Sequence, residues 1–191
     1  DESEVVVYAP EILPAATRAW WVLHYAGHKN VRILNGGLAA WKKAGGVIEQ
    51  GERQYTPTSY RGSFNPQMFA NKEEVLEAMG DNQVCTENAL MNESYQAAHI
   101  TGSTCLPCTD LMRGMDAFVD QSQLIEKLKK GSQIKRIITY CGGGIAATVN
   151  AVAHLMIGND NVAVYDGSLY EWISEGLPIT ESGDGNWAIW E

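Results

Sequence analysis

The sequence has no long hydrophobic run. Nowhere in its 191 residues does a stretch approach the roughly 18 consecutive apolar residues that a membrane-spanning helix needs. The chain also starts with the acidic residues Asp1, Glu2 and Glu4, the opposite of the basic beginning of a signal peptide. These absences predict a cytoplasmic protein that does not associate with membranes, and they leave open whether a leader has been removed.

Basic residues are also scarce. Lysine and arginine total 14 against 23 aspartate and glutamate residues, so the formal net charge is -9. A nucleic-acid-binding protein or a polybasic membrane anchor carries the opposite balance, because phosphate groups attract positive charge. The composition therefore predicts that nucleic acid is not a partner.

Cysteine is the third scarce residue, with four in the chain. So few cysteines do not make a disulfide scaffold, and a chain with 45% hydrophobic residues can bury a core without one. Cys105 and Cys108 have the C-x-x-C spacing of a redox pair or of half a zinc site, but no second C-x-x-C or H-x-x-x-H accompanies them. We interpret the cysteines as reduced, and we predict neither a metal site nor a cofactor.

What the sequence does contain is an internal repeat. The β-rich run at residues 5–8 returns in type at residues 137–140, and both runs end in tyrosine. Each copy continues with a loop, an apolar-periodic helix, a second β-rich run, a glycine turn and an aromatic-bearing helix. At a constant offset the copies share Ala16 and Thr17 with Ala147 and Thr148, Gly27 with Gly158, Gly36 with Gly167, Leu38 with Leu169, and Trp41 with Trp172. Alternating strands and helices predict an α/β fold with a parallel sheet and helices on both faces.

The two copies differ in completeness. The second has a long lead-in, in which we expect helices over 72–79, 92–98 and 121–130 and a strand over 83–86, whereas the first has seven residues before Tyr8. A parallel sheet needs its full set of βαβ units to be covered. We therefore divide the chain into the C-terminal half of a domain (1–57), a linker (58–67), a complete domain (68–182) and a C-terminal tail (183–191).

A second chain or another segment would then complete the first domain. Without it, the edges of a sheet and a helix face with Trp20, Trp21 and Leu23 would be exposed, which a soluble protein rarely tolerates. The alternative is a degenerate remnant that packs on a complete second domain.

The residues that can carry chemistry follow the strand at 134–140. Cys141 stands at its end, followed by Gly142, Gly143 and Gly144, then Ile145 and Ala146, and then a helix expected over 146–157. Glycine permits close approach of the backbone, and a helix start leaves free N–H donors, so several N–H groups can surround one sulfur. Such donors and the helix dipole favour the nucleophilic thiolate. We predict Cys141 as the catalytic residue and Gly142, Gly143, Gly144, Ile145 and Ala146 as its substrate-binding loop.

Two other interpretations of this motif are weaker. The first is a small buried cysteine with a packing role, which would not require three successive glycines. A cysteine phosphatase needs an arginine six positions after the cysteine to clamp phosphate, and that position is Ala147. The first copy keeps the same frame but has Ala9 in place of the nucleophile, so we predict that it is inactive.

Three segments together resemble the tandem-domain rhodanese family, the thiosulfate and 3-mercaptopyruvate sulfurtransferases: the cysteine loop with the run 161–172, the loop 99–103, and the run 35–41. The resemblance implies a rhodanese-like parallel sheet with an inactive half-domain and a complete active domain. It implies a sulfurtransferase that needs no cofactor. In such an enzyme Cys141 takes a sulfane sulfur from a small donor as a persulfide and passes it to cyanide or a thiol.

The sequence departs from the family where an anionic substrate would be held. Asn88, Ala89 and Leu90 stand where the family often has an arginine, and the loop after Cys141 carries neither a basic residue nor a serine. We therefore expect thiosulfate to be a poor donor unless a cation such as Arg113 reaches the site. The same departure keeps open an alternative function, a non-catalytic sulfur-relay or binding module.

Overall fold

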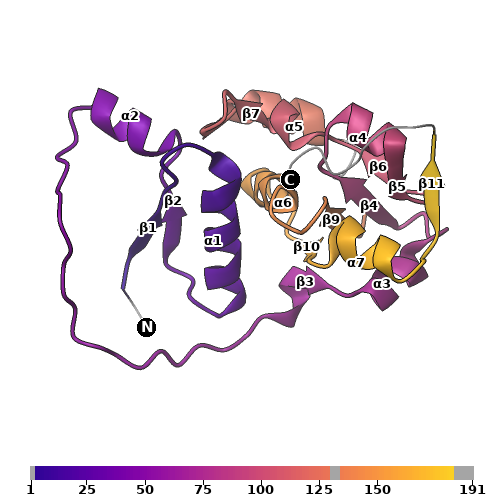
Figure 1. Ribbon diagram of the computed structural model, residues 1–191, viewed down its shortest axis with the longest axis horizontal. Coiled ribbons are helices and arrows are strands. Elements are labelled where there is room, and N and C mark those ends of the chain that lie inside the picture. Colours follow the sequence, from indigo (N-terminus) through magenta and orange to yellow (C-terminus); the bar gives the residue numbers. More distant parts are fainter. Residues whose placement is uncertain (1–2, 130–133, 183–191) are drawn as a thin grey trace.

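The structure is a computed structural model that describes residues 3–129 and 134–182. The predicted tail at 183–191, and the end of the helix expected over 121–130, lie outside the described residues. Within them, the second copy is built on a five-stranded parallel sheet (Figure 1). In spatial order its strands are β3 (Phe69–Ala70), β10 (Val162–Tyr165), β9 (Arg136–Tyr140), β4 (Val84–Asn88) and β6 (Thr104–Cys105).

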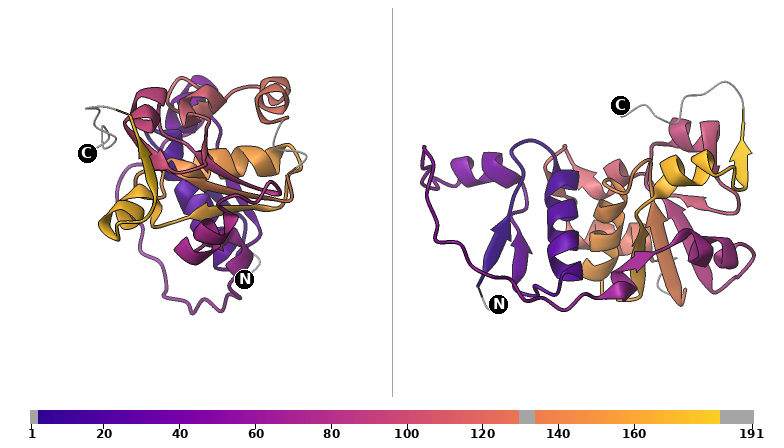
Figure 2. Two further views of the ribbon diagram at one scale, coloured as in Figure 1. Left: turned by 90° about the vertical axis from the view of Figure 1, so that its right-hand side faces the viewer. Right: turned by 60° about the horizontal axis from the view of Figure 1, so that its bottom comes forward.

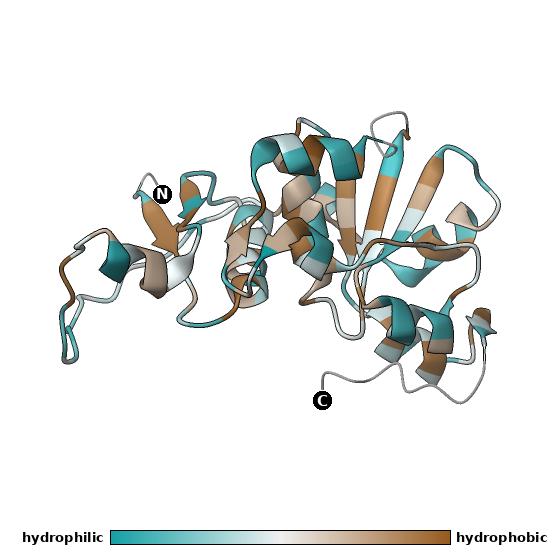
Figure 3. Ribbon diagram, turned by 90° about the horizontal axis from the view of Figure 1, so that it is seen from above, coloured by the Kyte–Doolittle hydropathy of each residue, from teal (hydrophilic) through white to brown (hydrophobic). Residues whose placement is uncertain are grey.

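The middle of this sheet is buried on both sides. All of β10 and all but the first residue of β9 are buried, and both are runs of β-branched and other apolar residues, as a parallel sheet requires. Figure 3 shows hydrophobic residues along these strands.

Helices cover both faces of the sheet (Figure 2). On one face, α6 (Ala147–Met156) packs on β9 and β10, and α5 (Gln121–Leu128) packs beside α6. On the other face lie α3 (Lys72–Ala78) and α7 (Ser168–Ser174). Side-chain caps fix two helix starts: Asn71 accepts from the N–H of Glu74, and Asp120 forms a capping box on α5. The predicted α/β fold is confirmed.

Short elements connect these layers. β5 pairs antiparallel with β11, and β7 pairs antiparallel with β8 in a small hairpin. The remaining bounds are η1 (Pro66–Met68), α4 (Asn92–Ala97), β5 (Ala98–Ile100), η2 (Cys108–Leu111), β7 (Met112–Arg113), β8 (Ala117–Phe118) and β11 (Ile179–Glu181).

The first copy contains four of the described elements: β1 (Val5–Val7), α1 (Leu13–Tyr25), β2 (Val31–Ile33) and α2 (Gly37–Lys43). β1 and β2 form a separate two-stranded parallel sheet. The four elements follow one another in the order that the repeat predicts from β9, α6, β10 and α7.

The two copies pack through their equivalent helices. α1 lies against α6 on the side away from the five-stranded sheet (Figure 2). At the contact, the buried hydroxyl oxygens of Thr17 and Thr148, which the repeat aligns, lie 2.8 Å apart. Trp21 is fully buried and its Nε1 donates to the carbonyl of Met68 over 3.1 Å. Without a completing segment, the helix face with Trp20, Trp21 and Leu23 was expected to be exposed. For Trp21 this expectation is wrong, because the second copy covers it, whereas Trp20 and Leu23 are half-buried.

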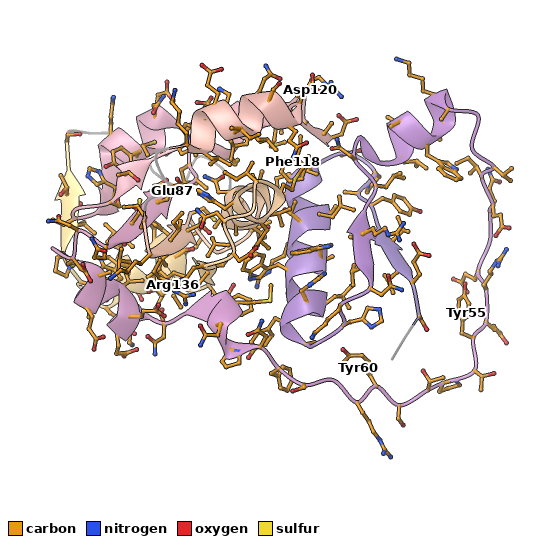
Figure 4. The ribbon with its side chains drawn as sticks, turned by 180° about the vertical axis from the view of Figure 1, so that it is seen from behind. Tyr55, Tyr60, Glu87, Phe118, Asp120 and Arg136 are labelled. Carbon is orange, nitrogen blue, oxygen red and sulfur yellow. The ribbon has the colours of Figure 1, made fainter. Side chains whose placement is uncertain are left out.

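Residues 46–65 carry no helix or strand and run around the outside of the molecule (Figure 4). Tyr55 is exposed on this segment, whereas the hydroxyl of Tyr60 donates to the carbonyl of Ala26 over 3.0 Å. The predicted linker, 58–67, is extended up to Asn65 and ends in η1. In the described part of the chain, no helix has the length and the apolar character needed to cross a membrane.

Candidate active site

Cys141 lies at the carboxyl end of β9, between β4 and β10 in the centre of the sheet. Its side chain is buried, and the preceding Tyr140 anchors the strand end. The Tyr140 hydroxyl lies 2.7 Å from Ser103 Oγ and accepts from the N–H of Ile100, and burial raises the pKa of Tyr140 to about 12. Ligand sites of parallel sheets form at this edge, so the fold places the predicted nucleophile where a substrate can reach it.

The loop from Cys141 to Ala146 is held through its carbonyl groups. Two of them accept from the start of α7, one accepts from the guanidinium of Arg18, and two accept from the start of α6. The acceptors and donors are Cys141 O with Leu169 N, Gly142 O with Tyr170 N, Gly144 O with Arg18 Nη1, Ile145 O with Thr148 N, and Ala146 O with Val149 N.

The N–H groups of the same loop do not take part in hydrogen bonds that hold it. Among the described residues, none of the backbone N–H groups of residues 142–146 donates to a carbonyl or to a side chain. A segment with most of its carbonyls bonded and its N–H groups free is suited to surround an anion. The role of Gly142, Gly143, Gly144, Ile145 and Ala146 as a cradle stays a prediction, and free N–H groups are what that role requires.

Glycine is required at position 144 of the loop. Gly144 has φ +79°, and a Cβ on it would stand 2.7 Å from Oδ1 and 2.8 Å from the carbonyl oxygen of Asp166. A Cβ on Gly143 would meet the Tyr170 ring at 3.1 Å, which is tight but concerns a side chain. The close approach of the loop to the turn after β10 therefore depends on Gly144.

Ser168 fixes the cysteine from the same turn. Its Oγ accepts from the N–H of Cys141 over 3.1 Å and donates to the carbonyl of Tyr165 over 2.8 Å. Ser168 has φ 51° and is the one non-glycine residue in the described ranges with positive φ. Sequence reasoning missed it as a site residue. The signal was available in the repeat, because the first copy has a glycine, Gly37, at the equivalent place.

Arg18 is the second residue that sequence reasoning missed. It comes from α1 in the first copy, and its Nη1 lies 2.5 Å from Asp166 Oδ1 and 3.4 Å from the carbonyl oxygen of Gly144. The first copy therefore holds the loop that carries the cysteine of the second. No local pattern around Arg18 indicates this contact.

A cavity of about 550 Å³ opens beside Cys141. Both copies contribute to its wall, and the backbone N–H of Leu13 joins them by donating to the carbonyl of Met115 over 2.7 Å. The lining residues are Ile12, Pro14, Leu90, Cys108, Thr109, Met112, Met115, Cys141, Gly142, Gly143, Ile145, Ala146 and Tyr170. None of these lining side chains is Asp, Glu, Lys, Arg or His.

The other candidate residues make different contacts. His99 Nδ1 lies 2.7 Å from the carbonyl oxygen of Tyr95, and its ring stacks on the Tyr95 ring. Arg113 faces Asp120 at 3.4 Å and is not part of the cavity wall. Burial raises the pKa of both Cys105 and Cys108 to about 11, and neighbouring Cys141 adds to the effect on Cys108. Among residues 3–129 and 134–182, no three His, Cys, Asp or Glu side chains are grouped as metal ligands.

The fold and the site define a class of protein: an α/β domain with a cysteine at the carboxyl edge of a parallel sheet, followed by a glycine loop. Comparison with known proteins places the chain within this class. The rhodanese-like domain family matches residues 1–44 and 68–175, in both copies of the repeat. The chain belongs to this family, and the predicted resemblance is confirmed.

Named relatives agree with this assignment. The chain is 29% identical over 196 residues to a probable 3-mercaptopyruvate sulfurtransferase of Pseudomonas aeruginosa, with 96% of this chain and 69% of the relative covered. It is 26% identical over 201 residues to the thiosulfate sulfurtransferase of Bos taurus, with 97% of this chain and 68% of the relative covered. The chain thus spans about two thirds of these relatives.

Solved structures share the fold. The crystal structure of SseA from Escherichia coli, described as a 3-mercaptopyruvate sulfotransferase, matches with a TM-score of 0.77 and 29% identity over 87% of this chain and 66% of that chain. The complex of EanB with ergothioneine matches with a TM-score of 0.86 over 95% of this chain and 51% of that chain. Its 20% identity supports the fold alone.

Proposed function

We propose that the chain is a sulfurtransferase. Cys141 takes a sulfane sulfur from a donor of the thiosulfate or 3-mercaptopyruvate class, holds it as a persulfide, and passes it to a thiophilic acceptor such as cyanide or a thiol. The observation that carries the proposal is the buried cysteine at the carboxyl end of β9 beside a loop whose N–H groups are free. The names of the relatives support the same reaction.

The transfer takes two displacement steps. The Cys141 thiolate attacks the sulfane sulfur, and the bond between that sulfur and the rest of the donor breaks with its electron pair remaining on the donor product, sulfite or the enolate of pyruvate. The acceptor then attacks the outer sulfur, and the S–S bond breaks to restore the thiolate. In the intermediate, the outer sulfur carries negative charge, which the N–H groups of residues 142–146 can stabilise without a basic side chain.

Intact mass spectrometry tests the proposal. Incubation with thiosulfate or 3-mercaptopyruvate is expected to add one sulfur atom to the chain, and cyanide is expected to remove it as thiocyanate. A folded chain that gains no sulfur from either donor or from an organic persulfide, at concentrations that load a known sulfurtransferase, contradicts the proposal.

A non-catalytic sulfur-relay or binding module is the second candidate function. The cavity wall favours it, because none of the described side chains that line the cavity is a cation for a small anionic donor. The two candidates differ in turnover. A relay module loads once at most from small donors, whereas a sulfurtransferase forms many equivalents of thiocyanate.

The contact of Arg18 with the loop predicts a catalytic effect of the first copy. Arg18→Met is expected to lower kcat for thiocyanate formation about three- to tenfold, because the loop loses a fixed position. The free energy of unfolding should change by no more than about 1 kcal/mol, since the pair with Asp166 is partly exposed. Arg32→Met is the matched control, because Arg32 pairs with Glu4 on the exposed side of β2. Equal kcat values in the two variants would contradict this role.

We also propose that another segment or a second polypeptide completes the sheet of the first copy. Residues that the repeat aligns differ in burial: Val6 is 51% exposed and Ile138 0%, Tyr8 is 55% exposed and Tyr140 0%, and Trp41 is 43% exposed and Trp172 0%. Parallel sheets are covered on both faces in most proteins, so a two-stranded one with apolar exposed residues favours additional strands.

Hydrogen exchange tests this second proposal. In the isolated chain, the amides of β1 and β2 are expected to exchange at least about a hundredfold faster than those of β9 and β10, because their strands open without unfolding the core. Equal protection of the two pairs of strands would mean that the first copy is a self-sufficient remnant. We also propose that the protein is cytoplasmic, and the four free cysteines, which are typical of a reducing compartment, support this proposal.

A further inference from the structure

The cavity beside Cys141 has an apolar wall and an apolar mouth. Ile12, Met115, Ile145 and Tyr170 line it, and each of these side chains is also exposed to solvent. Leu90 and Met112 line it from the buried side. Exposed apolar side chains that gather around one opening mark a binding surface, whereas scattered ones do not. The residues come from both copies, so the packing of α1 on α6 creates the mouth.

Among the described residues, no lysine or arginine side chain lines this cavity. Arg18 is paired with Asp166 and Arg113 with Asp120, and neither arginine belongs to the wall. The free N–H groups of residues 142–146 can therefore stabilise the charge at the reacting sulfur, but no side chain that the described residues contribute to the wall can neutralise a second charge. A donor with a further anionic group, such as a sulfonate or a carboxylate, has to place that group against apolar side chains, which is unfavourable.

The size of the cavity indicates which substituent the donor can carry in place of a second anionic group. Its volume, about 550 Å³, lies within the roughly 300–1,000 Å³ of sites for organic small molecules. A thiosulfate ion fills only a small part of it. An apolar substituent on the donor would instead displace water from Ile12, Leu90 and Met115, and flexible methionine side chains adapt to different shapes.

We propose that the preferred sulfur donor is an organic persulfide with an uncharged, apolar substituent of aryl or branched alkyl type. The inference rests on the proposed sulfurtransferase function and concerns its substrate. The Cys141 thiolate attacks the terminal sulfur of the donor R–S–SH. The S–S bond of the donor breaks, and its electron pair leaves with the thiolate R–S⁻. The terminal sulfur is thereby transferred to Cys141, which becomes the persulfide Cys–S–SH.

Two matched donors test the inference. Benzyl persulfide and 4-carboxybenzyl persulfide, generated freshly, have the same reacting sulfurs and differ in one remote carboxylate. We expect kcat/KM for sulfur transfer to cyanide, corrected for the rate without protein, to be at least about tenfold higher for the benzyl donor. Thiosulfate should be poorer than the benzyl donor as well. Equal values for the two benzyl donors, or a preference for the charged donor or for thiosulfate, would overturn the inference.

Two lysine substitutions locate the preference in the cavity. Met115→Lys brings a cation to the mouth and is expected to reduce the preference for benzyl over carboxybenzyl persulfide at least about fivefold. Met156→Lys is the control, because Met156 is equally exposed, at 44%, but lies at the end of α6 outside the wall. The same change of preference in both variants would also overturn the inference.

Failure of the underlying function gives a different result. In that case none of the three donors adds a sulfur to Cys141, and the inference falls with the function. If all three load Cys141 equally well, the sulfurtransferase function stands and only the donor preference is wrong.

Discussion

Cys141→Ser is expected to abolish sulfur loading, with less than about 1% of the wild-type gain by intact mass. A serine hydroxyl remains protonated at neutral pH and cannot form a persulfide, while the thiolate is the nucleophile of sulfur transfer. Thiocyanate formation should fall to the rate without protein. The result would assign the chemistry to the one cysteine that lies at the end of β9 and lines the cavity.

The fold should survive this substitution. Cys141 is buried, and a hydroxyl in its place costs up to about 2 kcal/mol, to be measured as a shift of the thermal midpoint. Cys108→Ser is the control, because Cys108 lines the same cavity and its thiol stays protonated, with burial raising its pKa to about 11. Sulfur found on Cys108, Cys105 or Cys85 in the loaded wild-type chain would show that Cys141 is not the carrier.

The repeat made much of the fold predictable. Once residues 5–8 were aligned with 137–140, the order of strands and helices in one copy had to hold in the other, and hydrophobic periodicity located β9, α6 and β10 to within about two residues. The cysteine loop was predictable for a local reason. A nucleophile, three glycines and a helix start are adjacent in sequence, so their proximity does not depend on tertiary structure.

The contacts that position this loop were not predictable, because they join distant parts of the chain. Arg18 and Asp166 are brought together by the packing of α1 on α6, which no periodicity specifies. The same packing buries Trp21, which we had expected to be exposed. Ser168 was missed for a different reason. A serine rarely adopts positive φ, so its identity alone does not indicate the turn that lets it bond to Cys141.

The backbone of the loop offers a second large effect, through Gly144. Gly144→Ala is expected to lower kcat for sulfur transfer on the order of a hundredfold while the chain stays folded, because a displacement of about 1 Å at a reacting centre can have that effect. The new methyl group would stand 2.8 Å from the backbone carbonyl oxygen of Asp166, which cannot swing away as a side chain can, so the loop and the turn after β10 must separate. Their separation shifts the N–H groups that would bind the outer sulfur.

Gly144→Ala introduces both backbone strain and a clash with Asp166. Gly158→Ala separates these two causes. Gly158 has φ +84°, close to the +79° of Gly144, but a Cβ on it meets nothing within 4 Å. Both variants should lose about 1 kcal/mol of stability from strain, whereas only Gly144→Ala should lose activity and a further 1–2 kcal/mol or so from the clash. The measurements are kcat for thiocyanate formation and the midpoint of urea unfolding. If Gly144→Ala retains as much activity as Gly158→Ala, the position of the loop against Asp166 does not matter for catalysis, and the cradle acts without it.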